Sequence, residues 1–140
     1  MVILGIGTDI VKNQRIQHIL RRHPARFLQK VLHPTEIKQF ESKKDDGQIS
    51  RQCTEFVASR WALKEAMVKA TQNRSLIFSG MYLYKPHLES AESATPNDKI
   101  QVKIDHPKNQ EILDSLGVRS IHSSISHEDD YSIAFVVLEK

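Results

Sequence analysis

One uninterrupted segment, residues 50–72, constrains the fold more than any other part of the sequence. It contains no proline or glycine, and Ser50 at its start is a suitable N-cap for a helix. Apolar residues recur within it at spacings of three, four and seven, which predicts a long α-helix with one face packed against a core. These apolar residues are Cys53, Phe56, Val57, Leu63, Met67 and Ala70. The charged residues expected on the opposite side are Arg60, Lys64, Glu65 and Lys69.

Shorter elements are expected on both sides of this helix. Residues 2–6 form an apolar run that predicts a buried strand ending in Gly7, Thr8 and Asp9. Helices are expected within residues 15–22 and from Pro24 and Pro34, because proline suits the first turn of a helix. The later expectations are strands at 76–78, 81–84, 100–104, 118–125 and 131–138, polar loops at 87–98 and 126–130, and a helix from 107 closed by Gly117.

This order of elements predicts the fold class. A chain of 140 residues fits one domain with one core, so we expect a single domain over residues 1–140. The domain is expected to be α+β, with an N-terminal strand, three helices and then an antiparallel sheet.

Composition excludes several classes of protein. The hydrophobic and charged fractions, 39% and 26%, are those of an ordinary soluble globular protein. No apolar run approaches the ~20 residues that cross a bilayer, so no membrane partner is expected. The first residues are too short an apolar run for a secretory signal. Cys53 is the single cysteine, which excludes an internal disulfide and favours a reducing, intracellular location, with Cys53 as a small buried thiol.

The positive charge of the chain is concentrated between residues 12 and 30. This segment has six basic and no acidic residues, whereas the whole chain has a net charge of +3. The charge asymmetry predicts an acidic partner, and taken alone it would suit nucleic acid, an anionic membrane surface or an acidic protein. The basic residues are Lys12, Arg15, Arg21, Arg22, Arg26 and Lys30. The main alternative function is a nucleic-acid-binding module without catalytic activity. However, Phe27 is the only aromatic residue of the segment and is assigned to the core, so surfaces for base stacking are missing and no nucleic acid is expected.

Acidic residues at two places could hold a metal ion. Asp9 follows two glycines and could cap a helix instead. Glu65 and Lys69 are four residues apart, the spacing of a surface ion pair worth about 0.3–0.5 kcal/mol. Arg60 and Lys64 bring more positive charge than Glu65 balances, and this suits a carboxylate that holds a cation while lysines hold phosphate oxygens.

A third polar group lies near the C-terminus. Ser124, Ser126 and His127 lack the Gly-x-Ser-x-Gly elbow of a serine hydrolase, and His127 alone is more often a hydrogen-bonding residue than a catalyst. The other histidines lack the spacing of zinc ligands. Neither a phosphate-binding loop nor a dinucleotide fingerprint is present, which argues against nucleotide binding by those routes.

Taken in order, these segments resemble one family. Residues 5–11, Gly-Ile-Gly-Thr-Asp-Ile-Val, with Arg15 and Ile16 after them, resemble the opening of the holo-acyl carrier protein synthases, the small class of 4′-phosphopantetheinyl transferases. Residues 27–32 with Thr35 and Glu36 resemble the next segment of that family. The helix 56–66, with Lys69 and Ala70, resembles its signature helix, and 124–127 its C-terminal motif. The resemblance runs from Gly5 to the C-terminus and is weak only near 87–98.

The resemblance implies an enzyme that moves the 4′-phosphopantetheine group of coenzyme A to a serine of an acyl carrier protein and releases adenosine 3′,5′-bisphosphate. Asp9 and Glu65 then hold Mg²⁺ against the pyrophosphate of coenzyme A, and Lys69 steadies the pyrophosphate and the leaving group. The base that takes the serine proton is Glu65, a metal-bound water or a carboxylate outside the motifs. The further coenzyme contacts implied are Arg60, Lys64, Ser126 and His127.

The resemblance also implies partners and a location. It implies a homotrimer with coenzyme sites shared between neighbours. Arg15, Arg22 and Arg26 are expected to dock the acidic carrier protein, which belongs to lipid metabolism as in fatty acid biosynthesis, or to lipoate or polyketide synthesis. Stand-alone fungal members act in mitochondria, so the expected compartment is mitochondrial for a fungal chain and cytoplasmic otherwise.

Three departures from the family pattern occur. Residues 71–74 replace a Gly-x-Gly turn, a polar stretch around Pro96 replaces a Gly-Lys-Pro turn, and Glu128 follows the histidine where relatives have Thr or Asp. No departure removes a proposed metal ligand, which argues against an inactive subunit that only stabilises an assembly.

Overall fold

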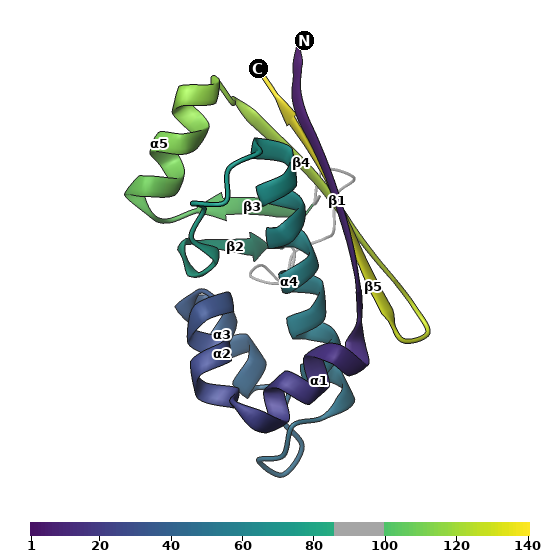
Figure 1. Cartoon of the computed structure of the whole chain (residues 1–140). Helices are drawn as coiled ribbons and strands as arrows, with labels where there is room; N and C mark the ends of the chain where they lie inside the picture. The colour runs from purple at the N-terminus through teal and green to yellow at the C-terminus, as the bar shows by residue number, and fades with distance from the viewer. Residues whose placement is uncertain (86–99) are drawn as a thin grey trace, which may run out of the picture.

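A long helix lies along one face of a three-stranded antiparallel sheet (Figure 1). The computed structural model describes residues 1–85 and 100–140, so the loop expected at 87–98 lies outside the described residues. The elements are β1 (Ile3–Lys12), α1 (Asn13–Arg22), α2 (Pro24–Val31), α3 (Pro34–Glu41), α4 (Arg51–Thr71), the 3₁₀ turn η1 (Phe78–Gly80), β2 (Met81–Tyr84), β3 (Gln101–Ile104), α5 (Pro107–Leu116), β4 (Ser120–Glu128) and β5 (Tyr131–Glu139).

The α+β class and the strand-first order are confirmed, with differences in detail. Four helices follow β1, one more than the three expected, because the long helix adds to three short ones. Prolines begin α2, α3 and α5, and Gly117 ends α5 with a left-handed φ of 78°. The strand expected at 76–78 is wrong, because Phe78 begins a 3₁₀ turn instead.

Helix α4 is the centre of the fold, and it is buried around most of its circumference. The hydroxyl oxygen of Ser50 accepts a hydrogen bond from the backbone N–H of Cys53 at 3.1 Å, which confirms the predicted N-cap. All six residues of the predicted apolar stripe are buried, Cys53 among them. The side opposite that stripe is not a solvated face, because Arg60 and Lys64 are only 8% and 1% exposed. Other elements pack against that side of the helix, so it does not face water.

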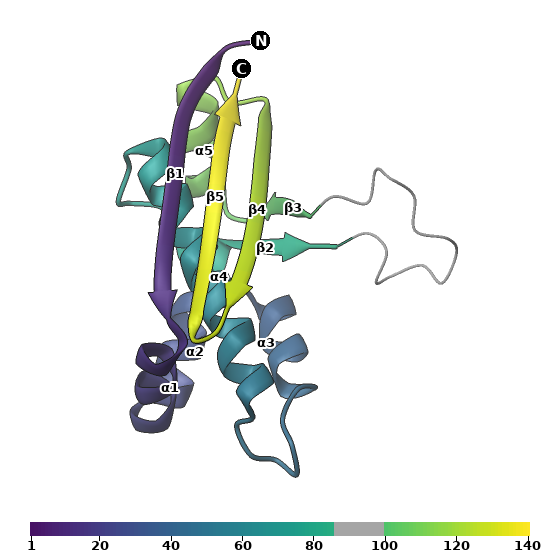
Figure 2. The same ribbon diagram turned by 90° about the vertical axis from the view of Figure 1, so that its right-hand side faces the viewer.

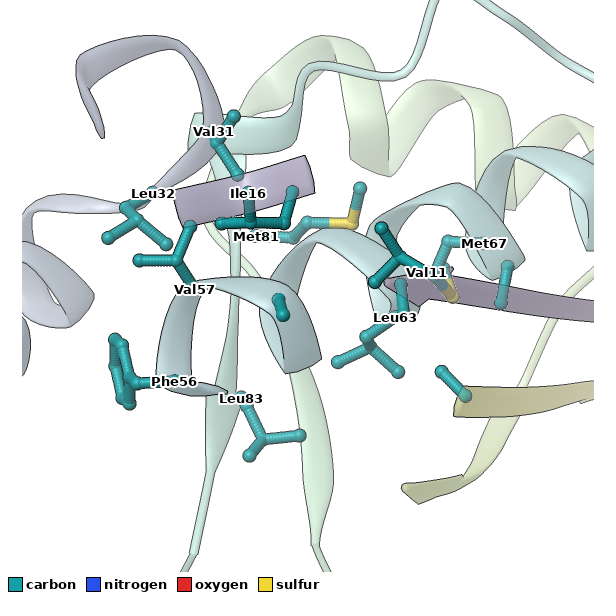
Figure 3. Packing of buried hydrophobic residues seen from close by; sticks show 14 of the residues in the cluster. Val11, Ile16, Val31, Leu32, Phe56, Val57, Leu63, Met67, Met81 and Leu83 are labelled. Carbon is teal, nitrogen blue, oxygen red and sulfur yellow. The ribbon is translucent and has the colours of Figure 1, made fainter. Parts of the chain in front are cut away.

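Side chains from several elements meet around α4. Figure 3 shows Ile16 of α1 and Val31 of α2 beside Met81 of β2 and Val57 of α4. Figures 1 and 2 show the three short helices gathered at one end of α4 and α5 at the other. The core is therefore continuous from the sheet, through α4, to the short helices.

The sheet has the strand order β1-β5-β4, and β5 pairs antiparallel with both neighbours. β1 continues to Lys12, so Asp9 lies within a strand and not at its end as expected, with Ala134 of β5 as its register partner. β4 continues to Glu128, so Ser126 and His127 are also strand residues and not loop residues. Backbone pairing with β5 extends these strands beyond the apolar runs that indicated them.

Two glycines let β1 approach α4 more closely than any other residue would allow. A Cβ atom added at Gly5 would lie 2.0 Å from the carbonyl oxygen of Ala70, and one at Gly7 would lie 1.9 Å from that of Ala66. Real side chains do not tolerate such contacts, so the glycines serve the packing of strand on helix. Asp9, two residues after Gly7 on the same face of β1, is thereby carried up to the helix.

The face of the sheet that points away from α4 is apolar and open. Among the described residues no element covers it, and Figure 2 shows the three strands side by side with the helices behind them. We call it the outer face; its apolar residues are Ile6, Ile10, Tyr131, Ile133 and Phe135, which are 40–60% exposed. In the part of the chain that the structure describes, no helix is long and apolar enough to cross a membrane.

Candidate active site

Asp9 of β1 and Lys69 of α4 are brought into direct contact. The ammonium of Lys69 donates to Oδ1 of Asp9 at 3.0 Å and to the backbone carbonyl oxygen of Thr8 at 2.9 Å. The Asp9 side chain is 16% exposed and that of Lys69 is 51% exposed. The pair is open on one side, so a ligand can reach both groups.

Glu65 lies one helical turn before Lys69, on the same side of α4. We call Asp9, Glu65 and Lys69 the Asp9 group. Burial raises the pKa of Glu65 above its ordinary value, and the negative charge of Asp9 raises it further. The charges that act against this shift of the pKa are those of Lys69, Arg15 and Arg74. Two carboxylates that repel each other within a ring of cations make a site that a divalent cation would stabilise.

The donor set suits Mg²⁺ better than a transition metal. Over residues 1–85 and 100–140 there is no cluster of three or more His, Cys, Asp or Glu side chains that could hold a metal ion alone. Mg²⁺ is commonly bound by one or two carboxylates together with substrate phosphates and water. Asp9 and Glu65 fit that pattern, since the two carboxylates act on each other beside the half-exposed Lys69 ammonium.

A separate group of cations, which we call the Arg60 group, consists of Arg60, Lys43 and Lys85. The guanidinium of Arg60 stacks on the ring of Phe56 at 4.0 Å. Its Nε is buried without a hydrogen-bond partner in the described part of the chain. Burial lowers the pKa of Arg60 to about 10, against the opposing charge of Glu36. Burial also lowers the pKa of Lys85, and the charges of Arg60 and Lys43 lower it further. Three cations thus crowd together, which favours an anionic ligand.

Two adjoining cavities open onto this cationic group. One, of about 360 Å³, is lined by Arg60, Lys43, Lys85 and the aromatic ring of Tyr82 among others. The other, of about 290 Å³, adds His127 of β4 to Arg60 and Lys43. Sequence analysis identified Arg60 and His127 but missed Lys43 and Lys85, whose only signal was their charge.

Lys64 reaches neither group. Its ammonium donates to Oε1 of Glu36 at 2.5 Å and to the carbonyl oxygen of Val31 at 2.7 Å, deep in the core. Burial lowers the pKa of Lys64, while Glu36 counters this. The structure therefore gives this side chain a partner in Glu36, a residue that sequence analysis noted only as part of a motif.

Ser126 and His127 are neighbours in β4 and so point to opposite faces of the sheet. His127 contacts the buried Ser132 on the helix side, whereas Ser126 lies on the side of the outer face. Only His127 is brought together with Arg60.

The three arginines predicted to dock a carrier are exposed on α1 and α2. Arg15 is also close enough to Glu65 to act on its pKa, so α1 borders the Asp9 group. Beside Arg26, a shallow groove of about 260 Å³ has Ile19 and Phe27 in its lining, with His23 and Lys30. This end of the molecule is thus basic around a small apolar patch.

The Asp9 group and the Arg60 group lie on opposite flanks of α4. Asp9 belongs to β1 and His127 to β4, the two outer strands of the sheet, which β5 separates. Two strand spacings of ~4.8 Å put about 10 Å between those strands. On α4 itself, Arg60 and Glu65 are five positions apart, which turns their side chains by roughly 140° about the helix axis.

Comparisons of the sequence and of the structure with known proteins point to the same family. A family profile described as "4'-phosphopantetheinyl transferase superfamily" matches residues 5–136. The holo-[acyl-carrier-protein] synthase of Vibrio atlanticus is 33% identical over 139 residues, covering 99% of both chains. The crystal structure of the Neisseria meningitidis holo-[acyl-carrier-protein] synthase has a TM-score of 0.80 at 27% identity, covering 99% of this chain and 100% of that one. The Helicobacter pylori synthase in complex with coenzyme A has a TM-score of 0.70 at 28% identity, covering 96% and 99%.

Proposed function

This chain belongs to the 4′-phosphopantetheinyl transferase superfamily, and we propose how its residues transfer the phosphopantetheine group of coenzyme A to a serine of an acyl carrier protein. The activity is that of a holo-[acyl-carrier-protein] synthase. The observation that carries the proposal is the contact of Asp9 with Lys69 beside Glu65, which joins two carboxylates to an accessible cation.

In this proposal Asp9 and Glu65 hold Mg²⁺. The ion would supply positive charge against the pyrophosphate of coenzyme A. Lys69 has an exposed ammonium that can donate to a phosphate oxygen as negative charge develops on the leaving group. The serine oxygen of the carrier gives its proton to a base and attacks the phosphorus that bears the pantetheine, the bond to the nucleotide half breaks, and adenosine 3′,5′-bisphosphate leaves.

The nucleotide half of coenzyme A is assigned to the cavities around Arg60. Arg60, Lys43 and Lys85 provide positive charge for a phosphate, and His127 adds a ring nitrogen on the other side. Lys64 is given a structural role, because its ammonium is already bonded to Glu36 and Val31.

The coenzyme is proposed to bind between two copies of the chain in a homotrimer. The Asp9 group and the Arg60 group lie on opposite flanks of α4. A coenzyme molecule that contacts both groups would therefore take the Asp9 group from one copy and the Arg60 group from a neighbouring copy. The outer face offers an apolar surface that a further copy can cover, with Phe135 45% exposed near its middle.

Calorimetry tests the function as a whole. Coenzyme A is expected to bind in the presence of Mg²⁺ and to bind much more weakly after chelation of the metal, because the pyrophosphate would then meet two uncompensated carboxylates. Duplex DNA and RNA serve as control polyanions and are expected not to bind. Tight, metal-independent binding of either nucleic acid would instead support the alternative of a basic nucleic-acid-binding module.

Assembly can be disrupted by placing a charge on the outer face. Phe135→Glu is expected to reduce the mass in light scattering from three chains to one, because a carboxylate would be buried without a partner in the interface. Transfer activity should fall with it. Leu116→Glu, at a residue 41% exposed on α5, is the matched control and should leave both unchanged. A wild-type chain that is monomeric and fully active would contradict the trimer.

Shared sites make a further prediction for mixed assemblies. Asp9→Ala and Arg60→Ala chains, each inactive alone, should regain about a quarter of the wild-type sites when reassembled together in equal amounts, since each mixed trimer then contains one intact site. If each site were built within one chain, no activity would return.

Charge reversal tests carrier docking. Arg22→Glu together with Arg26→Glu should raise the KM for carrier protein by tenfold or more and flatten its dependence on salt, because exposed charges mainly speed association and are screened over ~8 Å. The KM for coenzyme A should barely change. Lys38→Glu with Lys108→Glu, two exposed positions outside α1 and α2, is the control of equal charge. Unchanged carrier kinetics in the first variant would remove the docking role.

A further inference from the structure

A chain of hydrogen bonds runs from His127 into the protein interior. Nδ1 of His127 lies 3.0 Å from the hydroxyl oxygen of Ser132, and that hydroxyl donates to Oδ1 of Asn13 at 2.8 Å. Ser132 is fully buried and Asn13 is 5% exposed. The three residues come from β4, β5 and the first turn of α1, so the chain of bonds joins three separate elements.

The direction of these bonds determines where the imidazole carries its proton. A serine hydroxyl has one hydrogen, and here it is given to the amide oxygen of Asn13. Ser132 can then only accept from His127, so Nδ1 must carry a hydrogen. The backbone N–H of Asn13 also donates to the carbonyl oxygen of Asp130 at 2.7 Å, which holds Asn13 against the β4–β5 turn. Asn13, the acceptor at the end of these hydrogen bonds, is therefore held in place by its backbone as well as by its side chain.

We propose that Asn13 and Ser132 are positioning residues that keep His127 in its Nδ1–H form and leave Nε2 as the nitrogen available to the coenzyme. This inference rests on the proposed function, which places His127 at the nucleotide half of coenzyme A. Nε2 is on the far edge of the ring from Ser132, and His127 lines the cavity that contains Arg60 and Lys43. Because Nδ1 keeps its hydrogen, Nε2 of the neutral ring is a hydrogen-bond acceptor, which suits a hydroxyl or amino group of the nucleotide half.

Nuclear magnetic resonance tests this hydrogen-bond relay, which runs from His127 through Ser132 to Asn13, without any assay of activity. Correlation spectra of protein labelled with ¹⁵N in histidine report which ring nitrogen is protonated, and the neutral ring of His127 is expected as the Nδ1–H form. Ser132→Ala, or Asn13→Ala, which frees the Ser132 hydroxyl to donate to Nδ1, should convert the ring to the Nε2–H form. Asn13→Asp retains the acceptor oxygen and should preserve the wild-type spectrum. An Nε2–H ring in the wild type, or no change in Ser132→Ala, would overturn the relay.

Kinetics connect the relay to coenzyme binding. Ser132→Ala and Asn13→Ala should each raise the KM for coenzyme A several-fold with little change in kcat. Asn13→Asp, which retains the acceptor oxygen, should keep the KM near the wild-type value. Ser123→Ala is the matched control, because its buried hydroxyl oxygen has no hydrogen-bond partner in the described part of the chain and its loss should change nothing. An unchanged KM in His127→Ala would overturn the coenzyme contact of the proposed function and the link to catalysis, whatever tautomer the spectra show.

Discussion

Replacing Asp9 or Glu65 by alanine is expected to lower kcat/KM for phosphopantetheine transfer by about 100- to 1,000-fold or more, because each variant loses a metal ligand where charge develops in the transition state. The fold should persist, since neither side chain belongs to the apolar core. Removing one carboxylate also removes its repulsion of the other, so thermal stability should be unchanged or slightly higher. The mass shift of a carrier protein measures the transfer.

A matched variant separates loss of the metal site from general loss of a carboxylate. Asp114 is exposed on α5, where its carboxylate accepts a hydrogen bond from the side-chain amide of Gln110, and Asp114→Ala should transfer at the wild-type rate. In Asp9→Asn and Glu65→Gln the shape of the side chain is kept, and activity should stay low while the Mg²⁺ concentration for half-maximal rate rises. Full activity in either alanine variant would remove that residue from the metal site.

The second large effect is expected at Glu36, which is fully buried and bonded on both carboxylate oxygens. Oε1 accepts from the backbone N–H of His33 at 3.1 Å and from the ammonium of Lys64 at 2.5 Å. Oε2 accepts from the backbone N–H of Leu83 at 3.3 Å and lies 3.6 Å from Nε of Arg60. A single carboxylate thus joins α3, α4 and β2 and is the shared counter-ion of two buried cations.

Glu36→Ala is therefore expected to lower the free energy of unfolding by about 3–5 kcal/mol, because it leaves buried charges without a counter-ion. Denaturant unfolding at a fixed protein concentration measures this, since assembly makes stability depend on concentration. Glu41→Ala, on the same helix, removes only an exposed pair with Lys44 at 2.8 Å and should cost less than ~1 kcal/mol. Equal losses in the two variants would show that the buried network contributes nothing beyond a surface pair.

A smaller loss is expected when both partners of the pair are replaced. Glu36→Leu with Lys64→Met removes a carboxylate and an ammonium together, so the double variant should be more stable than the sum of the single changes implies. Arg60 loses its contact with Glu36 in that variant but should keep its stacking on Phe56 and its place in the cavity lining. Coenzyme binding should consequently suffer less than stability, which distinguishes a structural role of Lys64 from a direct contact.

Much of the fold could be predicted because its signals act over a few residues. The cap at Ser50, the prolines that begin α2, α3 and α5, and the left-handed Gly117 each concern atoms within one helical turn. Strands β1 and β4 continue beyond their predicted ends, because those ends are held by hydrogen bonds to β5 and not by their own apolar pattern. The identity of Asp9, Glu65 and Lys69 as a group came from resemblance, and the contact of Lys69 with Asp9 spans 60 positions.

What the sequence determined by itself was the set of elements, the α+β class and the residue types available for chemistry. Tertiary structure alone decided which charges are used for binding and which for stability. Lys64 and Lys69 are both lysines of one helix, yet Lys64 meets Glu36 in the core and Lys69 meets Asp9 at the surface. Burial makes the difference, because an ammonium removed from water must keep its partner, whereas one that is half exposed can exchange it for a phosphate.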